Sequence, residues 1–424
     1  MGFAPVSTCL LNGPLGSLEV SCKQSGLNQP TTHYREGSVV LEPGGGFFRP
    51  ESRPSRDLSV LLAAFQQQRR EKFSPALHWL DLMAGCGIRA LRWGLEAVKP
   101  SLLASGVEQL PELWVNDADL ERASLLERNL APLRQEQISL KLFHQPAEVL
   151  LSRAYLDQCR FDLIDLDCFG CPNAFLQPVL QVLASEGLLL LASSDGRSPT
   201  GHDRPGAIRS LAAAARVHPA SWEIALRLQL GVLARHAWLL GRGLEPLVSF
   251  SEGRTFRVAV RIKRRLAAGE ESQLGLLARC EACGAQLAQP LLSLQGWSGC
   301  MCSQGGGRWA VSGPLWLGPL QSPVVLADLL VLAEQSIVPI ASATLRLLHR
   351  LQSDIGLPVY CWSTAELAKR LVLSGPPSVL ALVRALRFAG HEACGSAVMA
   401  GQLRTDATVT ELLRICHEMC QEGR

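Results

Sequence analysis

The sequence carries little net charge: 41 Lys and Arg residues stand against 38 Asp and Glu residues, a formal charge of +3 over 424 residues. A protein that binds nucleic acid through its overall charge would be strongly basic, so a polyanion site here must come from local clustering. The length is typical of two or three domains. An apolar fraction of 47% supplies a substantial core and excludes global disorder.

Signals for export and membrane insertion are also missing. Residues 1–18 contain no Lys or Arg before their weakly apolar stretch, so we expect no signal peptide. No run approaches the about 18 apolar residues of a membrane-spanning helix. The longest apolar run, Pro323–Ala333, is interrupted by Asp328. We therefore expect a cytoplasmic protein without a membrane partner.

Cysteine is too sparse for a disulfide framework, with 14 residues spread over the chain. Most occur singly and are expected to be small core or surface residues. Two groups stand out. One is the pair Cys168 and Cys171, and the other consists of Cys280, Cys283, Cys300 and Cys302.

Short apolar runs alternate with helical patterns through the first part of the chain. Strands are predicted at 78–83, 113–115, 138–143, 161–166 and 187–192, and helices at 58–73, 88–98, 120–130 and 220–240. This alternation predicts an α/β fold with a mostly parallel, doubly wound, Rossmann-like sheet. Two further strands, at 246–250 and 255–260, complete the unit.

A domain boundary is expected after the basic run Arg261–Arg265. The first domain would cover residues 1–266, and a smaller α+β domain residues 267–424. The second domain contains the cysteine group at 280–302. It continues at 320–424 with helices and two short strands, a winged-helix-like pattern.

Three motifs fall at carboxyl ends of predicted strands, where an open α/β sheet binds its ligand. In the first, residues 81–87 read D-x-x-A-G-x-G, with Asp81, Gly85 and Gly87. The glycines permit a tight turn, and the helix that follows offers free N–H groups to a carboxylate. The pattern is neither the G-x-G-x-x-G of dinucleotide binders nor a P-loop. Alone, such a turn can equally be a tight connection.

The second motif is Asn116-Asp117, at the end of the second strand. A carboxylate there commonly binds ribose hydroxyl groups. Asp117 or Asp119 can also cap the helix that follows, and the two roles are compatible.

The third motif, Asp165 to Pro172, reads D-L-D-C-F-G-C-P. Asp167 falls at the open end of its strand and is followed closely by Phe169. A carboxylate beside an aromatic ring suits a flat base with an exocyclic amine, because the ring stacks on the base and the carboxylate accepts hydrogen bonds from the amine. The Cys168–Cys171 pair could instead be a redox pair, which is the weaker interpretation.

Taken together, these motifs resemble those of the S-adenosylmethionine-dependent tRNA (guanine-26) N2-dimethyltransferase family. The resemblance covers roughly residues 35 to 410. Further matching segments are Arg35-Glu36-Gly37, Arg56-Asp57-Leu58-Ser59, Gly85 to Arg92, Glu223 to Arg227, Pro246 to Ser251, Gly313 to Gly318 and Arg404 to Ala407.

The resemblance implies roles for particular residues. It places Asp167 as the catalytic carboxylate, the Cys168 carbonyl as a second acceptor for the amine, and Phe169 as the stacking ring. The expected methyl-donor site comprises Arg56, Asp81, Gly85, Gly87, Arg89, Asp117, Pro146 and Ala147. The chain departs from the family at Cys168, where members usually have proline, at Pro146, where they often have aspartate, and over 196–209.

The second cysteine group has the spacing C-x2-C-x16-C-x-C. Four thiolates from two turns can close a tetrahedral zinc site, and Gly284 would allow the first turn. The resembled family has four cysteines in this region, which implies a structural rather than a catalytic ion. The alternative is a set of reduced thiols without metal.

The resemblance implies tRNA as partner and N2,N2-dimethylguanosine at position 26 as product, and we infer no obligate protein partner. Arg384 and Arg387 could contact tRNA phosphates or belong to an ordinary solvated face. Two alternatives stay open. One is N2-methylation of guanine in another RNA or at another position, and the other is a tRNA-binding folding aid with weak or lost catalysis.

Overall fold

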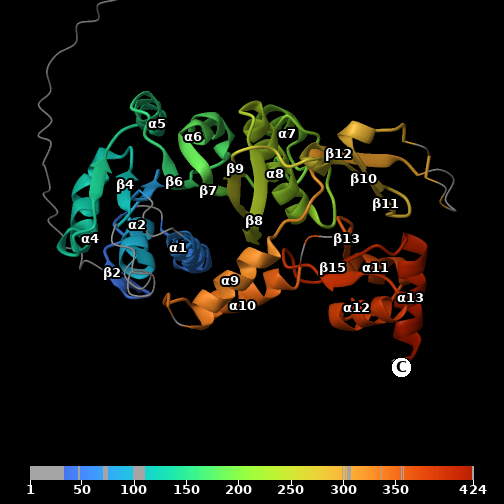
Figure 1. Ribbon diagram of the computed structural model, residues 1–424. Coiled ribbons are helices and arrows are strands. Elements are labelled where there is room, and N and C mark those ends of the chain that lie inside the picture. The colour runs from blue at the N-terminus through green and yellow to red at the C-terminus, as the bar shows by residue number, and fades with distance from the viewer. Residues whose placement is uncertain are drawn as a thin grey trace, which may run out of the picture. The chain divides into compact units, whose positions relative to one another are not determined.

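A mixed sheet forms the centre of the fold. Its strands are β3 (His78–Asp81), β4 (Glu112–Asn116), β5 (Leu140–Phe143), β6 (Phe161–Asp167), β7 (Leu183–Ser193), β8 (Gly243–Glu252) and β9 (Thr255–Lys263). They lie in the order β5-β4-β3-β6-β7-β9-β8 (Figure 1). The first five are parallel, whereas β9 runs antiparallel to both β7 and β8. The direction in which strands are added reverses between β3 and β6, so the ligand-binding crevice is expected there.

The computed structural model describes residues 33–422 apart from 46–47, 70–74, 99–109, 298, 301, 303–306, 336, 355 and 357. The described residues belong to one compact unit, which begins at His33. The first 32 residues of the expected domain 1–266 thus lie outside the description. In the described part, no helix combines the length and apolarity needed to cross a bilayer.

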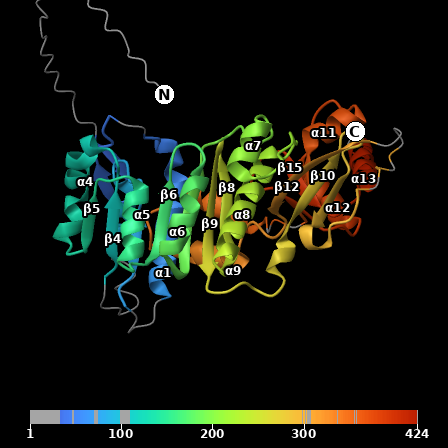
Figure 2. The ribbon, with the colours of Figure 1, turned by 90° about the horizontal axis from the view of Figure 1, so that it is seen from above.

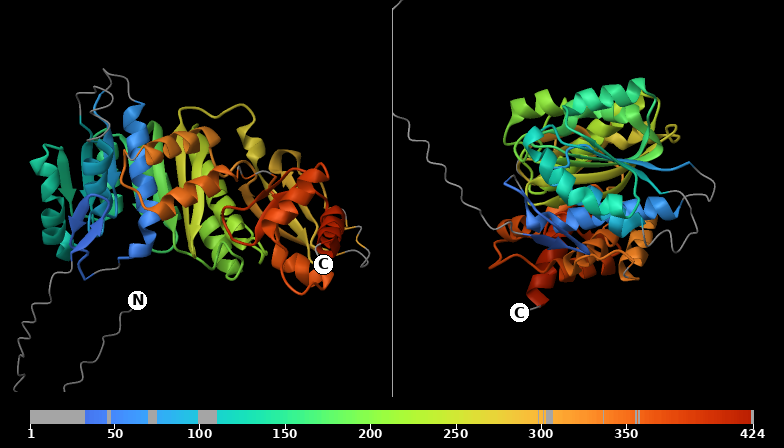
Figure 3. Two further views of the ribbon diagram at one scale, coloured as in Figure 1. Left: turned by 90° about the horizontal axis from the view of Figure 1, so that it is seen from below. Right: turned by 90° about the vertical axis from the view of Figure 1, so that its left-hand side faces the viewer.

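Helices cover both faces of the sheet. One face carries α1 (Arg53–Gln68), α2 (Ile88–Arg92), α4 (Ala123–Gln135), α9 (Pro323–Glu334) and α10 (Ser342–Gln352), and the left view of Figure 3 looks onto it. The other carries α5 (Ala147–Leu156), α6 (Leu176–Val182), α7 (Arg204–Leu211) and α8 (Ser221–Leu239), seen in Figure 2. In β7, Leu188 and Leu190 join the first core, while Leu189 and Leu191 join the second. A strand buried on both faces therefore reads as a continuous apolar run.

The predicted elements are present with shifted ends. The helix predicted at 58–73 begins at Arg53 and ends at Gln68, and residues 70–73 lie outside the described part. The helix predicted at 88–98 is α-helical only to Arg92 and continues as a π-helical turn over Trp93–Val98. In the described residues of the segment 320–424 there are three short strands rather than two.

Two smaller sheets follow the large one. Strands β10 (Leu274–Cys280), β11 (Gln286–Pro290) and β12 (Trp309–Trp316) lie in the order β11-β10-β12, and β12 packs on α8. Strands β13 (Cys361–Ser363), β14 (Ala393–Gly395) and β15 (Gln402–Thr405) lie in the order β13-β15-β14. The helices α11 (Thr364–Leu371), α12 (Val379–Phe388) and α13 (Val409–Glu422) complete this unit around its own apolar cluster. A hairpin of β1 (Tyr34–Glu36) and β2 (Val39–Leu41) precedes the main sheet.

The segment after residue 320 is divided between two cores. Its first helices, α9 and α10, pack on α1 in the main core, whereas the later elements form the separate cluster. The boundary expected after residue 266 stays a prediction.

Candidate active site

A cleft of about 840 Å³ opens at the carboxyl ends of β3, β4 and β6. Ten of the eleven residues predicted for the methyl-donor and catalytic sites line it: Arg56, Asp81, Gly85, Arg89, Asp117, Pro146, Ala147, Asp167, Cys168 and Phe169. Gly87 is the exception. The cleft brings together residues that are up to 113 positions apart in the chain, counting from Arg56 on α1 to Phe169 after β6.

The glycine turn after β3 forms the floor of the cleft. The Gly85 N–H donates to Asp117 Oδ2 at 2.8 Å, and the Ala84 N–H donates to the Asn116 carbonyl at 2.9 Å. Gly87 precedes α2 with φ of +77°, and a Cβ there would lie 3.0 Å from Leu126 Cδ2. Gly87 therefore contributes to the shape of the turn but does not line the cleft.

Asp117 and Asp119, the two residues that could cap the helix after β4, make different contacts. Asp119 Oδ1 accepts from the Glu121 N–H at 3.0 Å and caps the short 3₁₀ turn that begins at Leu120. Asp117 instead holds the glycine turn and accepts from the Asp119 N–H at 3.0 Å. The capping role therefore falls to Asp119, while Asp117 lies in the cleft, where a ribose-binding role stays a prediction.

Arg56 lies in the wall of the cleft, and its guanidinium group is already bound by the protein. Its Nη2 lies 2.6 Å from Glu36 Oε2, and it donates to the Arg49 and Pro50 carbonyls. Arg56 therefore ties α1 to the loop before it and to β1.

Two arginines hold the carboxylate of Asp167. Arg89, from α2, places Nη2 at 2.5 Å from Asp167 Oδ2 and Nε at 3.4 Å from Asp165 Oδ1. Arg257, from β9, places Nη1 at 3.1 Å from the same Asp167 oxygen. Burial alone would raise the pKa of Asp167, but the charges of Arg257 and Arg89 outweigh it and lower the pKa to about 2. Asp167 is therefore an anion at neutral pH.

The neighbouring carboxyl groups shift in the opposite direction. Burial raises the pKa of Asp165 to about 6, against the charge of Arg89. Burial and the nearby Asp165 raise the pKa of Asp81 to about 8. Asp81 is only 2% exposed, and its Oδ2 has no hydrogen-bond partner among the described residues. At neutral pH Asp167 is therefore the charged carboxylate at the cleft, whereas Asp165 and Asp81 are closer to their uncharged, protonated form.

The loop after Asp167 is fixed to the end of β7. The Gly170 N–H donates to Ser194 Oγ at 2.7 Å, and the Gly170 carbonyl accepts from the Ser194 N–H at 2.9 Å. These bonds provide part of the rigidity that a proline at position 168 would give. Phe169 is 78% exposed on this loop and lines the cleft.

The cysteine pair in this loop is poorly suited to redox chemistry. Burial and the charge of Asp167 raise the pKa of the Cys168 thiol to about 11, and burial raises that of Cys171. The reactive thiolate is therefore scarce at neutral pH.

Sequence reasoning missed Arg257. It lies 90 residues after Asp167 in the chain, in an arginine-rich strand without a local motif. Only the pairing of β9 with β7 brings it to the cleft.

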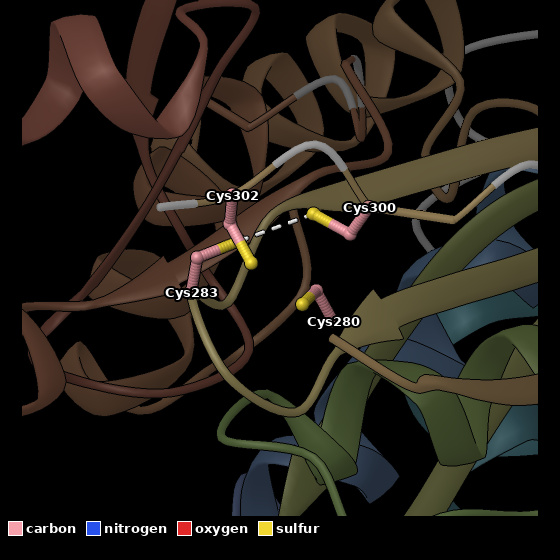
Figure 4. Close-up of side chains that lie close together, drawn as sticks. All are labelled: Cys280, Cys283, Cys300 and Cys302. Carbon is pink, nitrogen blue, oxygen red and sulfur yellow. Dashed lines mark hydrogen bonds between the residues drawn. The ribbon is translucent and has the colours of Figure 1, made fainter. Parts of the chain in front are cut away.

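The second cysteine group converges at the end of β10. The sulfur atoms of Cys280, Cys283, Cys300 and Cys302 all lie within 4.8 Å of one another, with Cys283 and Cys300 at 3.5 Å (Figure 4). A tetrahedral zinc ion with bonds of about 2.3 Å needs sulfur atoms about 3.8 Å apart. Gly284, with φ of +79°, forms the tight turn expected after Cys283. The sulfur–sulfur distances are thus close to those that a zinc ion requires, so the four side chains could hold one.

The doubly wound sheet and the residues gathered at its switch point together define a Rossmann-like methyltransferase. The family model for N2,N2-dimethylguanosine tRNA methyltransferases matches residues 28–417, and the chain belongs to this family. The resemblance found in the motifs and the expected α/β fold are both confirmed.

Relatives and a solved structure are similar to this chain over most of its length. The tRNA (guanine(26)-N(2))-dimethyltransferase of Pyrococcus furiosus is 26% identical over 375 residues, which are 85% of this chain and 90% of the relative. That of Archaeoglobus fulgidus is 26% identical over 386 residues, covering 89% and 97%. The structure of Trm1 from Pyrococcus horikoshii with S-adenosyl-L-methionine has a TM-score of 0.72 at 22% identity and covers 91% of this chain and 99% of that one. This last likeness supports the fold.

Proposed function

We propose that the protein transfers methyl groups from S-adenosylmethionine to the exocyclic N2 of guanosine 26 in tRNA, giving N2,N2-dimethylguanosine. Membership of the family supports the reaction class. The observation that carries the proposal is the ionised Asp167, held by two arginines at the rim of the cleft and followed by the exposed ring of Phe169.

We place the donor in the part of the cleft that the glycine turn and Asp117 line. When bound, S-adenosylmethionine supplies an electrophilic methyl group on a sulfonium ion. Asp117 offers a carboxylate where ribose hydroxyl groups would lie, and the turn at Gly85 leaves room for close backbone approach, since no atom lies within 4 Å of a Cβ built there.

Asp167 would accept one N2–H hydrogen bond and the Cys168 carbonyl the other, turning the nitrogen lone pair toward the methyl group. Because the amine becomes positively charged as its bond to carbon forms, a fixed anion stabilises the transition state. A carboxylate with a pKa of about 2 is a weak base. That is sufficient, since a methylated and protonated aromatic amine is strongly acidic and loses its proton to the carboxylate or to water.

The target base must leave its stack to reach this site, and Phe169 is the ring on which it would stack. Arg384 is exposed on α12 and remains a candidate for phosphate contact, whereas Arg387 donates from Nε to the Ala393 carbonyl at 2.7 Å. A tRNA substrate also supports the expected cytoplasmic location. We further propose a structural zinc ion at the four cysteines, which takes no part in methyl transfer.

The test uses purified protein, labelled methyl donor and two tRNA transcripts that differ only in carrying guanosine or adenosine at position 26. Label should appear only in the first, as N2-methylated guanosine. Asp167→Asn should lower the transfer rate by at least about a hundredfold. Asp328→Asn, in a surface pair with Arg69 at 2.8 Å, is the matched control and should retain full activity.

Each alternative predicts a different result. Label in both transcripts would indicate another target position. Tight tRNA binding without label in any transcript would favour the folding aid. Unchanged activity in Asp167→Asn would remove the catalytic assignment.

A further inference from the structure

We propose that Arg257 binds O6 of the target guanine, so that Asp167 and Arg257 together select guanine by its Watson–Crick edge. This inference rests on the proposed function and adds a specificity-determining residue to the same site.

The sheet register places the two side chains on one face. Asp167 of β6 is the register partner of Ala192 of β7, and Ala192 is the register partner of Arg257 of β9. Two strand spacings amount to about 9.5 Å, which a long arginine side chain can bridge. Ala192, with a single methyl group, leaves the path between them open, and Arg257 reaches Asp167 Oδ2 at 3.1 Å.

A second carboxylate fixes the direction of the Arg257 guanidinium. Its Nε lies 2.7 Å from Glu252 Oε2, and Glu252 Oε1 accepts from the Ser55 N–H of α1 at 3.2 Å. The side chain is only 12% exposed, so the group is held between two anchors.

One donor and one acceptor remain available beside each other. Among the described residues, Arg257 Nη2 and Asp167 Oδ1 have no hydrogen-bond partner, and both residues line the cleft. The site therefore offers an acceptor and, next to it, a donor.

This pattern is complementary to guanine. Along its Watson–Crick edge guanine presents the two N2–H donors, the N1–H donor and then the O6 acceptor. The Cys168 carbonyl and the Asp167 carboxylate would each accept one N2–H bond, Asp167 would also accept from N1–H, and the Arg257 guanidinium would donate to O6. Adenine presents an N1 acceptor and an N6 donor, so it would set acceptor against acceptor and donor against donor. Guanine O6 is an acceptor that arginine and lysine commonly bind in protein–DNA complexes. Leaving a buried polar group unpaired is a strong source of discrimination.

The test compares tRNA carrying guanine at position 26 with tRNA carrying 6-thioguanine there. The analogue keeps the N1 and N2 donors and replaces O6 with sulfur, a weak acceptor. Wild-type enzyme should prefer guanine by about tenfold or more in kcat/KM. In Arg257→Ala the ratio should fall to near one, while Arg257→Lys should retain part of the preference.

A residue that only positions Asp167 would behave differently, since Arg257→Ala would then lower both rates equally and leave the ratio unchanged. Arg261→Ala is the matched control: Arg261 lies on the same strand, pairs with Glu245 Oε2 at 3.0 Å and does not line the cleft. Its ratio should equal that of the wild type.

The wild-type measurement does not depend on the folding of any variant. Equal rates for guanine and 6-thioguanine would overturn the role of Arg257 and leave the proposed function intact. Failure to methylate the guanine tRNA at all would instead overturn the proposed function.

Discussion

A buried group of four charges joins α8 to the last sheet, and breaking it should destabilise the protein strongly. Arg227 Nε lies 2.7 Å from Glu223 Oε1, and Arg404 Nε lies 2.7 Å from Asp354 Oδ1. Arg404 also pairs with Glu223. All four side chains are at most 1% exposed, and two guanidinium groups balance two carboxylates.

The change to make is Glu223→Gln, which preserves shape and removes one charge. The group would then hold two buried cations against one anion. Removing one partner of a buried pair typically costs about 3–5 kcal/mol. Arg227 keeps three carbonyl acceptors, at Trp316, Gly318 and Gly356, and Arg404 keeps Asp354. We therefore expect a loss at the lower end, about 3 kcal/mol.

Urea unfolding at neutral pH measures this loss. Glu127→Gln is the control, since Glu127 pairs with Arg134 at 2.8 Å with both side chains about half exposed. It should change the unfolding free energy by less than about 1 kcal/mol. A loss below about 1 kcal/mol for Glu223→Gln would refute the reasoning.

The pH dependence supplies a second check. Burial alone would raise the pKa of Glu223, but Arg404 and Arg227 outweigh it and lower the pKa. A carboxylate with a lowered folded-state pKa stabilises the fold above its unfolded pKa of about 4.3, and the contribution is lost as the pH falls through the folded value. The difference between wild type and Glu223→Gln should therefore shrink in acid.

Three further perturbations test the site and its surroundings. Burial raises the pKa of the Asp81 carboxyl group to about 8 in the folded protein, against about 3.9 in the unfolded chain. The contribution of this group to stability is therefore fully present below the unfolded pKa and is lost as the pH rises through about 8. Between those two pH values the free energy of unfolding of the wild type should fall with pH by at most about 1.4 kcal/mol per pH unit, and Asp81→Asn should remove this slope. Equal slopes for the two proteins, measured by urea unfolding at several pH values, would contradict this. Gly87→Ala should lower the free energy of unfolding by about 1–2 kcal/mol, because alanine is strained in the left-handed backbone conformation of this residue. Contact of the added Cβ with Leu126 should lower it further. Gly241 also has a positive φ, of +67°, but no atom lies within 4 Å of a Cβ built there. In the same unfolding assay Gly241→Ala should therefore show only the loss that is due to the backbone conformation. Elemental analysis should find one zinc per chain, lost on chelation and in Cys283→Ser but retained in Cys168→Ser; no metal in the wild type would exclude the site.

Much of the cleft at the carboxyl ends of β3, β4 and β6 could be predicted because each part is encoded locally. The turn at Gly85 and Gly87 follows a short apolar run, and Asp117 and Asp167 each end another. Parallel strands place such endings at one edge of a sheet, so proximity followed from the α/β pattern alone. The strand limits moved by only a few residues.

Other features depended on contacts that no local pattern encodes. Leu326 and Leu329 of α9 fall within the expected second domain, 267–424, but they pack in the main core on the side of α1. The helix from Ile88 turns π-helical at Trp93, whose Nε1 donates to Ser59 Oγ on α1 at 3.2 Å. Arg56 lines the cleft as expected, but its ion pair with Glu36 is a contact that no local motif encodes.

The sequence by itself determined the family, the doubly wound sheet and the carboxylate motif around Asp167. The spacing of apolar residues, the glycine turns and the strand ends on which these depend are properties of neighbouring residues. The tertiary structure alone decided the charge state around that carboxylate. Asp167 has a low pKa because Arg89 and Arg257 converge on one of its oxygens, and Asp81 has a high one because it is buried beside another acid. These effects depend on distance and on exclusion of water, which a chain acquires only when distant strands lie side by side.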